Sequence, residues 1–164
     1  NAIASSLLSA SLISGKSALT SASMRLWMEE IKKLADYCLE PEEIGAKPAS
    51  GSFKTCGMLV VPCSMKTVAG IHSGYADNLL LRAADVTLKE QRPLVLAARE
   101  TPMSAIHLRN LYELSRMPGV RIIPPMLTFY QKPENIDEMV YHIAAKLLEP
   151  FGIEAKEYKR WNGL

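Results

Sequence analysis

The feature that most constrains the fold is the run Gly57-Met58-Leu59-Val60-Val61-Pro62, which carries no polar side chain. A run of this length without alternation is typical of a parallel strand that is covered on both faces. A similar run follows at residues 93–98, a third strand is predicted over 120–123, and segments of helical character separate the three, at about 78–90 and 104–117. Strands that alternate with helices of about ten or more residues predict right-handed crossovers and a parallel sheet.

This pattern predicts an α/β fold of the doubly wound class, a three-layer Rossmann-like (flavodoxin-like) parallel sheet in a single domain. An earlier helix is predicted over about 27–38, with a loop after it over 45–52. Asn135 is predicted to cap a last helix. The expected apolar stripe of that helix consists of Ile136, Met139, Val140, Ile143, Ala144, Leu147 and Leu148.

Composition excludes several classes of protein. Nineteen Lys and Arg against seventeen Asp and Glu leave a net charge of +2, which argues against nucleic-acid binding through bulk charge. No apolar run approaches the ~18 residues of a membrane span. The three cysteines and three histidines are scattered, without a C-x-x-C or H-E-x-x-H motif. We therefore expect neither a disulfide framework nor a metal site, and we expect a reducing, cytoplasmic compartment.

The beginning of the chain differs from the rest. Residues 1–25 are rich in Ser and Ala, and we expect them to form a segment separate from a domain over 26–164. The segment lacks the basic start of a signal peptide, and we expect that the chain is missing its true beginning. Gly15-Lys16-Ser17 looks like the tail of a P-loop, but Ala10 stands where the first glycine is required, so nucleotide triphosphate binding is not predicted.

Polar residues follow each predicted strand. Ser64, Lys66 and Thr67 follow the first, Arg99-Glu100-Thr101 follows the second, and Tyr130 comes after the third. In open parallel sheets, ligands bind beyond the carboxyl ends of the strands. Ser64 stands at a predicted helix start, where it serves either as an N-cap or in binding a phosphate. Together the strand ends favour an anionic ligand.

Charged residues on the helix over 78–90 leave two interpretations open. Arg82 and Asp85 are spaced i,i+3, and Asp85 and Lys89 are spaced i,i+4, as in pairs on a solvated surface. The same segment is rich in Leu, Ala and Val, so much of it must be buried. Charges on a mostly buried helix need partners, and a bound phosphate is one candidate.

From about residue 30 onward, the chain resembles the UbiX-like flavin prenyltransferases, including the branch that accompanies aromatic-acid decarboxylases. The motifs cover roughly four fifths of the chain and are highly specific in combination. They are Ser50-Gly51-Ser52-Phe53, Pro62-Cys63-Ser64-Met65-Lys66-Thr67, Gly74-Tyr75-Ala76-Asp77-Asn78-Leu79, Arg82-Ala83-Ala84-Asp85-Val86, Leu88-Lys89-Glu90, Arg99-Glu100-Thr101-Pro102, Ile106-His107-Leu108, Pro124-Pro125, Phe129-Tyr130 and Arg160-Trp161-Asn162-Gly163.

The resemblance implies a metal-independent transfer of a dimethylallyl group from dimethylallyl phosphate to N5 and C6 of FMN. The prenylated FMN would serve a UbiD-type decarboxylase, and the enzyme would be a homododecamer with its sites at subunit interfaces. The implied catalytic residues are Lys89, Glu100 and Tyr130. The implied flavin-binding residues are Ser14, Ser64, Met65, Lys66, Thr67, Arg82 and Arg99. The implied residues around the substrate phosphate are Lys89, Arg99, Glu100, Tyr130 and Lys146.

Two departures from the family pattern stand out. The Gly-rich strand and loop that cradle the FMN phosphate in the family have no counterpart here, and Lys146 replaces an arginine, which keeps the charge but loses the bidentate fork. A non-catalytic flavin-binding subunit of a hydroxyarylic acid decarboxylase system is therefore the alternative function. An FMN-dependent peptidyl-cysteine decarboxylase is disfavoured, because its Pro-Ala-Ser-Ala-Asn-Thr motif differs from residues 62–67.

Overall fold

Three parallel strands form the centre of the fold. The computed structural model describes residues 29–158 and 160. These fall into two compact units: residues 39–125, called the sheet unit below, and the segments up to residue 38 and from residue 126, called the terminal unit. The strands belong to the sheet unit and lie in the order β1 (Met58–Cys63), β2 (Leu94–Ala98) and β3 (Val120–Ile122).

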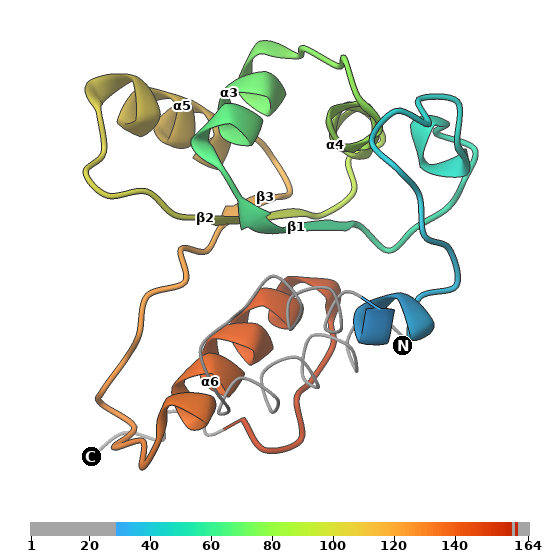
Figure 1. Ribbon diagram of the computed structural model, residues 1–164. Coiled ribbons are helices and arrows are strands. Elements are labelled where there is room, and N and C mark those ends of the chain that lie inside the picture. Colours follow the sequence, from blue (N-terminus) through green and yellow to red (C-terminus); the bar gives the residue numbers. More distant parts are fainter. Residues whose placement is uncertain (1–28, 159, 161–164) are drawn as a thin grey trace. The chain divides into compact units, whose positions relative to one another are not determined.

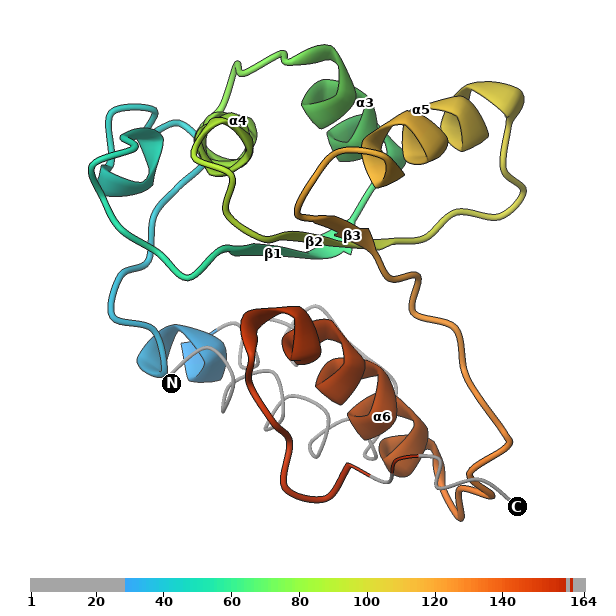
Figure 2. The same cartoon turned by 180° about the vertical axis from the view of Figure 1, so that it is seen from behind.

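The helices of the sheet unit cover one face of this sheet. The helices α3 (Met65–Ser73) and α4 (Leu79–Lys89) connect β1 to β2, and α5 (Ala105–Ser115) connects β2 to β3. Two views from opposite sides place all three on the same face (Figures 1 and 2). Right-handed crossovers that progress in one direction across a parallel sheet require this arrangement. A short 3-10 helix, η1 (Lys47–Ala49), interrupts the predicted loop.

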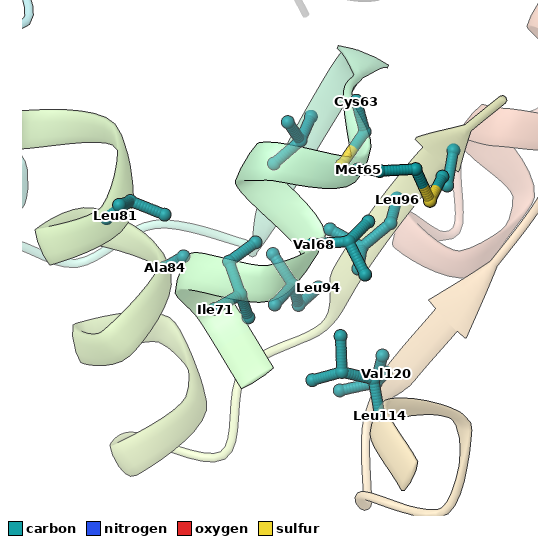
Figure 3. Close-up of a cluster of buried hydrophobic side chains, with 12 residues drawn as sticks. Cys63, Met65, Val68, Ile71, Leu81, Ala84, Leu94, Leu96, Leu114 and Val120 are labelled. Carbon is teal, nitrogen blue, oxygen red and sulfur yellow. The ribbon is translucent and has the colours of Figure 1, made fainter. Parts of the chain in front are cut away.

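The core lies between the sheet and these helices. Leu94 and Leu96 of β2 cluster with Val68 and Ile71 of α3 and with Leu114 of α5 (Figure 3). All five residues of β2 are buried, as expected for a central strand. The edge strand β1 differs from the prediction, because burial is interrupted along it and Val61 is 42% exposed.

The predicted helix starts of the sheet unit are confirmed by their caps. The side chain of Ser64 accepts a hydrogen bond from the backbone N–H of Thr67, and Asn78 accepts one from Leu81. Ser104 forms a capping box at the start of α5. Each cap satisfies an N–H group that has no partner within its own helix.

The terminal unit contains α6 (Ile136–Leu148) and the 3-10 helix η2 (Glu149–Phe151). Asn135 caps α6 as predicted. The buried residues of α6 are Ala144, Leu147 and Leu148, which belong to the predicted stripe, and Ala145, which does not. The prediction was wrong for Ile136, which is 66% exposed, because the first turn of α6 buries no side chain.

The predicted helix over about 27–38 ends earlier in the structure, at residue 33. Within the described residues it covers only 29–33, and every residue from 29 to 38 is exposed. The ion pairs Glu29–Lys32 and Glu30–Lys33 support this single turn. An amphipathic pattern that buries no apolar face does not sustain a longer helix. Ser14 and residues 15–17 lie outside the described residues. Among those described, no helix has the length and apolar character to cross a membrane.

Candidate functional site

The carboxyl ends of β1 and β2 bring several predicted site residues together. Cys63 at the end of β1 is the register partner of Ala98 at the end of β2. Ser64 and Arg99 directly follow Cys63 and Ala98. They therefore lie at the carboxyl ends of two neighbouring strands, which are about 4.8 Å apart. We call this edge, with Ser64, Lys66, Thr67, Arg99 and Glu100, the strand-end rim.

Hydroxyl groups and a helix N-terminus occupy the β1 side of the rim. The Ser64 Oγ accepts from the Thr67 N–H at 3.2 Å and lies 3.1 Å from the Thr67 Oγ1. Ser64 and Lys66 are exposed, and Thr67 is half-buried. Both interpretations of Ser64 are compatible with this geometry, because the hydroxyl that caps α3 keeps a proton that it can donate either to the Thr67 Oγ1 or to a ligand. The positive end of the helix dipole and the Lys66 ammonium favour a negatively charged ligand here.

Two side chains beside the rim are turned into the core. Met65 is only 7% exposed and packs in the hydrophobic cluster, so its thioether does not face the surface. Cys63 is also buried, and burial raises the pKa of its thiol to about 11. The thiol stays protonated at neutral pH and is a poor nucleophile. Both side chains pack in the hydrophobic core next to the rim.

A carboxylate and a guanidinium follow β2. Arg99 is exposed, and Glu100 is half-buried. The Oε1 of Glu100 accepts a hydrogen bond from the backbone N–H of Thr101 at 2.9 Å. This contact fixes the carboxylate to the backbone and leaves its second oxygen for a ligand or for proton transfer.

Lys89 and its neighbours form a second polar cluster in the sheet unit. The Lys89 Nζ lies 2.8 Å from the Glu90 Oε1, and Arg92 lies 3.8 Å from the same carboxylate. Arg92 also donates to the backbone carbonyls of Gly51 and Phe53, at 2.7 and 2.8 Å. A Cβ on Gly51 would meet the Glu90 carboxylate, so a side chain at this loop position would displace that carboxylate from its place beside Lys89.

This cluster lies near the amino-terminal ends of the strands, whereas the rim lies at their carboxyl ends. Arg92 immediately precedes Pro93, whose carbonyl accepts from the first residue of β1, whereas Glu100 follows the end of β2. Strand β2 alone spans roughly 13 Å at about 3.3 Å per residue. The structure therefore does not bring Lys89 and Glu100 together within one chain.

The charges on α4 find partners within the protein. Arg82 donates to Asp85 at 2.8 Å, as the i,i+3 spacing predicts, and both side chains are 40% exposed. Lys89 pairs with Glu90 rather than with Asp85. The solvated-surface interpretation therefore describes Arg82, and its predicted contact with flavin stays a prediction.

In the terminal unit, Tyr130, His142, Lys146, Glu149 and Tyr158 form a network that we call the Tyr130 cluster. The Tyr130 Oη lies 3.3 Å from the His142 Nε2, and the rings of His142 and Tyr158 lie 4.9 Å apart. Lys146 donates to Glu149 at 2.6 Å. A cavity of about 530 Å³ adjoins the cluster and is lined in part by His142 and Tyr158.

The electrostatics of this cluster reflect its partners. The hydrogen bond to Glu149 raises the pKa of Lys146, which therefore keeps its positive charge at neutral pH. Burial, and then the charge of Lys146, lower the pKa of His142, so its imidazole is neutral at pH 7. Burial also raises the pKa of the Tyr158 phenol. A cation, a phenol and a neutral imidazole together suit an anionic ligand.

Sequence reasoning missed Glu90, His142 and Glu149. The spacing of Lys146 and Glu149 is i,i+3 on a helix end and could have predicted their pair. His142 lies twelve residues from Tyr130, and no local pattern marks their contact. Within the part of the chain that is described, no group of three or more His, Cys, Asp or Glu side chains could hold a metal ion.

Comparison with known proteins matches this arrangement to a family. The family model described as Flavoprotein matches residues 2–148. A protein of Streptomyces sp. (strain D7), named Probable UbiX-like flavin prenyltransferase, is 52% identical over 139 residues, which is 85% of this chain and 69% of the relative. The resemblance carried by the sequence motifs is thereby confirmed.

Solved structures give the same answer. A dodecameric, FMN-dependent UbiX-like decarboxylase from Escherichia coli O157:H7 superposes with a TM-score of 0.83 at 44% identity, over 98% of this chain and 91% of that one. AnUbiX, in complex with FMN and dimethylallyl pyrophosphate, has a TM-score of 0.81 at 37% identity, over 100% and 93%. The predicted flavodoxin-like fold class is confirmed, and the chain belongs to the UbiX-like flavin prenyltransferase family.

Proposed function

We propose that this chain joins a dimethylallyl group, taken from dimethylallyl phosphate, to N5 and C6 of reduced FMN. The product, prenylated FMN, passes to a UbiD-type aromatic-acid decarboxylase. The observation that carries the proposal is the strand-end rim, where Ser64, Arg99 and Glu100 follow the carboxyl ends of two paired parallel strands. The FMN and allylic pyrophosphate held by AnUbiX support it.

The rim fits a flavin mononucleotide. The α3 N-terminus, the Ser64 and Thr67 hydroxyls and the exposed Lys66 offer hydrogen-bond donors and positive charge, and a flavin ring and its phosphate accept such bonds. Met65 takes part through its backbone, because its side chain is buried. When bound, reduced FMN supplies the electron-rich N5 and C6 to which the allyl group is joined.

The chain's own residues assist cleavage of the allylic C–O bond. That cleavage leaves negative charge on the phosphate, which the Arg99 guanidinium, the Tyr130 hydroxyl and the Lys146 ammonium stabilise. Glu100, held by the Thr101 N–H, would give a proton to the departing phosphate and later accept one from the flavin. The reaction balances when the allylic C–O bond and the N5–H and C6–H bonds break and the N5–C and C6–C bonds form: of the two protons released, one goes to the phosphate and the other to the middle carbon of the allyl group. No metal is required, since the fixed cations stabilise the leaving group.

Lys89 enters this scheme from a second copy of the chain. Within one chain, Lys89 lies near the amino-terminal ends of the strands, beside Gly51 and Glu90, whereas Glu100 lies at the carboxyl ends. A site that uses both residues is therefore built at an interface between copies, and we propose a homododecamer like the E. coli UbiX-like protein. Three free cysteines accord with a cytoplasmic, reducing location.

The deciding experiment is mass spectrometry of flavin extracted after anaerobic incubation with reduced FMN and dimethylallyl phosphate. A flavin heavier by one dimethylallyl unit is the expected result. Flavin that is retained but unmodified would support the alternative, a non-catalytic flavin-binding subunit. A protein that retains no flavin would contradict both. A parallel reaction with dimethylallyl pyrophosphate tells which allylic donor the chain uses.

Subunit mixing tests the shared site. Lys89→Ala and Glu100→Gln variants are each expected to lose nearly all of their activity alone. If the two residues come from different copies, oligomers reassembled from an equal mixture recover about a quarter of the wild-type activity. Each site then has a one-in-two chance of an intact Lys89 from one copy and a one-in-two chance of an intact Glu100 from the other. No recovery from a mixture that has exchanged subunits would show that Lys89 acts in the site of its own chain or outside the site.

A further inference from the structure

His142 is held against Tyr130 by more than one contact. Its Nε2 lies 3.3 Å from the Tyr130 Oη, and the two rings meet edge to face, with centroids 5.9 Å apart and planes at 87°. Tyr158 contacts the His142 ring at 4.9 Å. Both ring neighbours restrict the orientation of the imidazole, so Nε2 stays directed at the phenol oxygen.

The direction of this hydrogen bond follows from the ligand chemistry. A phenol has one proton and can also accept. The oxygens of a phosphate dianion only accept, so Tyr130 must donate its proton if it is to bind one. If Tyr130 instead donated to His142, a lone pair would face the phosphate and repel it. The compatible arrangement has the His142 Nε2–H donating to the Tyr130 Oη.

The surroundings of His142 make this a choice between tautomers. Burial lowers the pKa of His142, and the positive charge of Lys146 lowers it further, against an opposing effect of Glu149. The ring is therefore neutral at pH 7 and carries one N–H, on either Nδ1 or Nε2. Only the Nε2–H tautomer lets the Tyr130 Oη accept from His142 and donate its own proton to the phosphate.

We propose that His142 is a positioning residue, whose Nε2–H donates to the Tyr130 Oη and so aims the phenol proton at the phosphate of the dimethylallyl donor. The inference rests on the proposed function, because it assigns the phosphate as the partner of Tyr130. It adds a residue that touches neither substrate and acts only through Tyr130.

Steady-state kinetics test the functional half of this proposal. His142→Phe keeps an aromatic ring but loses the donor, and we expect kcat/KM for dimethylallyl phosphate to fall about tenfold, mainly through KM. His142→Gln places an amide N–H near the position of Nε2 and should restore most of the loss. His72→Gln, in the sheet unit, is the matched control and should leave KM unchanged.

A double variant separates positioning from a structural role. In a Tyr130→Phe background, His142→Phe should have little further effect, because the group that it positions is gone. An equal tenfold loss in both backgrounds, or a failure of His142→Gln to rescue a variant whose thermal unfolding is unchanged, would overturn the proposal. If wild type makes product and Tyr130→Phe is normal, the assignment of Tyr130 fails, and the role of His142 fails with it.

Imidazole nitrogen NMR tests the proposal without turnover. The expected spectrum shows His142 neutral at pH 7 with its proton on Nε2, and Tyr130→Phe should shift the Nε2 resonance while leaving that of His72 in place. A proton on Nδ1 would overturn the proposal even if the enzyme is active. An Nε2–H tautomer in a protein that makes no prenylated flavin would instead contradict the proposed function and, with it, the phosphate as ligand.

Discussion

The strand-end rim and the Tyr130 cluster hold their polar groups in different ways. At the rim the fixing partner is the backbone: Ser64 is held by the Thr67 N–H, and Glu100 by the Thr101 N–H. In the Tyr130 cluster the fixing partners are other side chains, as in the contact of Tyr130 with His142 and the pair of Lys146 with Glu149. The geometry of the rim therefore follows from the backbone fold, whereas the geometry of the Tyr130 cluster depends on contacts between a few particular side chains.

This difference has energetic consequences. The rim continues directly from β2, whose five residues are buried, so damage to the core should reach the site. The Lys146 side chain is 53% exposed, and an ion pair at such a position adds little to stability. Changes in the core beside the rim should therefore lower stability strongly, and changes in the cluster should alter binding more than stability.

The largest expected effect comes from removing the proton-transfer group of the rim. Glu100→Gln keeps the shape of the side chain and its contact with the Thr101 N–H, but it can neither give nor accept a proton. We expect prenyl transfer to slow by about 100-fold or more, with flavin binding retained. Single-turnover rates at saturating dimethylallyl phosphate measure the loss. Equal rates for variant and wild type would show that Glu100 carries no proton.

The next effect tests the link between rim and core. Leu96 is fully buried in the centre of β2, and Leu96→Ala should lower the free energy of unfolding by about 3 kcal/mol. Urea unfolding followed by circular dichroism checks this. Leu80→Ala, on the exposed side of α4, should cost much less. Similar losses for both variants would show that the core does not support the sheet unit as described.

The sheet unit was largely predictable because its signals are local. Uninterrupted apolar runs marked β1 and β2, and Ser64, Asn78 and Ser104 stand as caps directly before their helices. Parallel topology follows from the length of the connections. The pairing of Cys63 with Ala98 then places Ser64 and Arg99 at one edge, so that part of the site could also be predicted.

The remainder of the site depends on contacts that have no local signal. The separation of Lys89 from Glu100 depends on the direction in which the chain leaves α4, which composition does not encode. The contact of Tyr130 with His142 joins a loop to a helix. The burial of Met65 depends on the rotation of α3, which periodicity predicts only approximately.

A smaller effect separates the two interpretations of Ser64. Ser64→Ala removes the N-cap of α3 and should cost about 1 kcal/mol of stability. Asn78→Ala removes the corresponding cap of α4 and should cost about the same. Only Ser64→Ala should also weaken FMN binding, measured by flavin fluorescence titration. If both variants bind FMN like wild type, Ser64 is a cap and nothing more.

The smallest expected effect lies in the Tyr130 cluster and depends on pH. The hydrogen bond to Glu149 raises the pKa of Lys146 above its ordinary value of 10.5, so the folded state holds this proton more tightly than the unfolded state does. The stabilisation is therefore fully present below pH 10.5 and is lost as the pH rises through the raised value. Because the Lys146 side chain is half exposed, Lys146→Gln should lower stability at pH 7 by less than about 0.5 kcal/mol, with the difference vanishing in strong base. Urea unfolding at neutral and high pH measures both. A difference that persists in strong base would mean that Lys146 stabilises α6 through the packing of its methylene groups rather than through its ion pair with Glu149. The Tyr130 cluster would then, like the rim, depend on packing as well as on polar contacts.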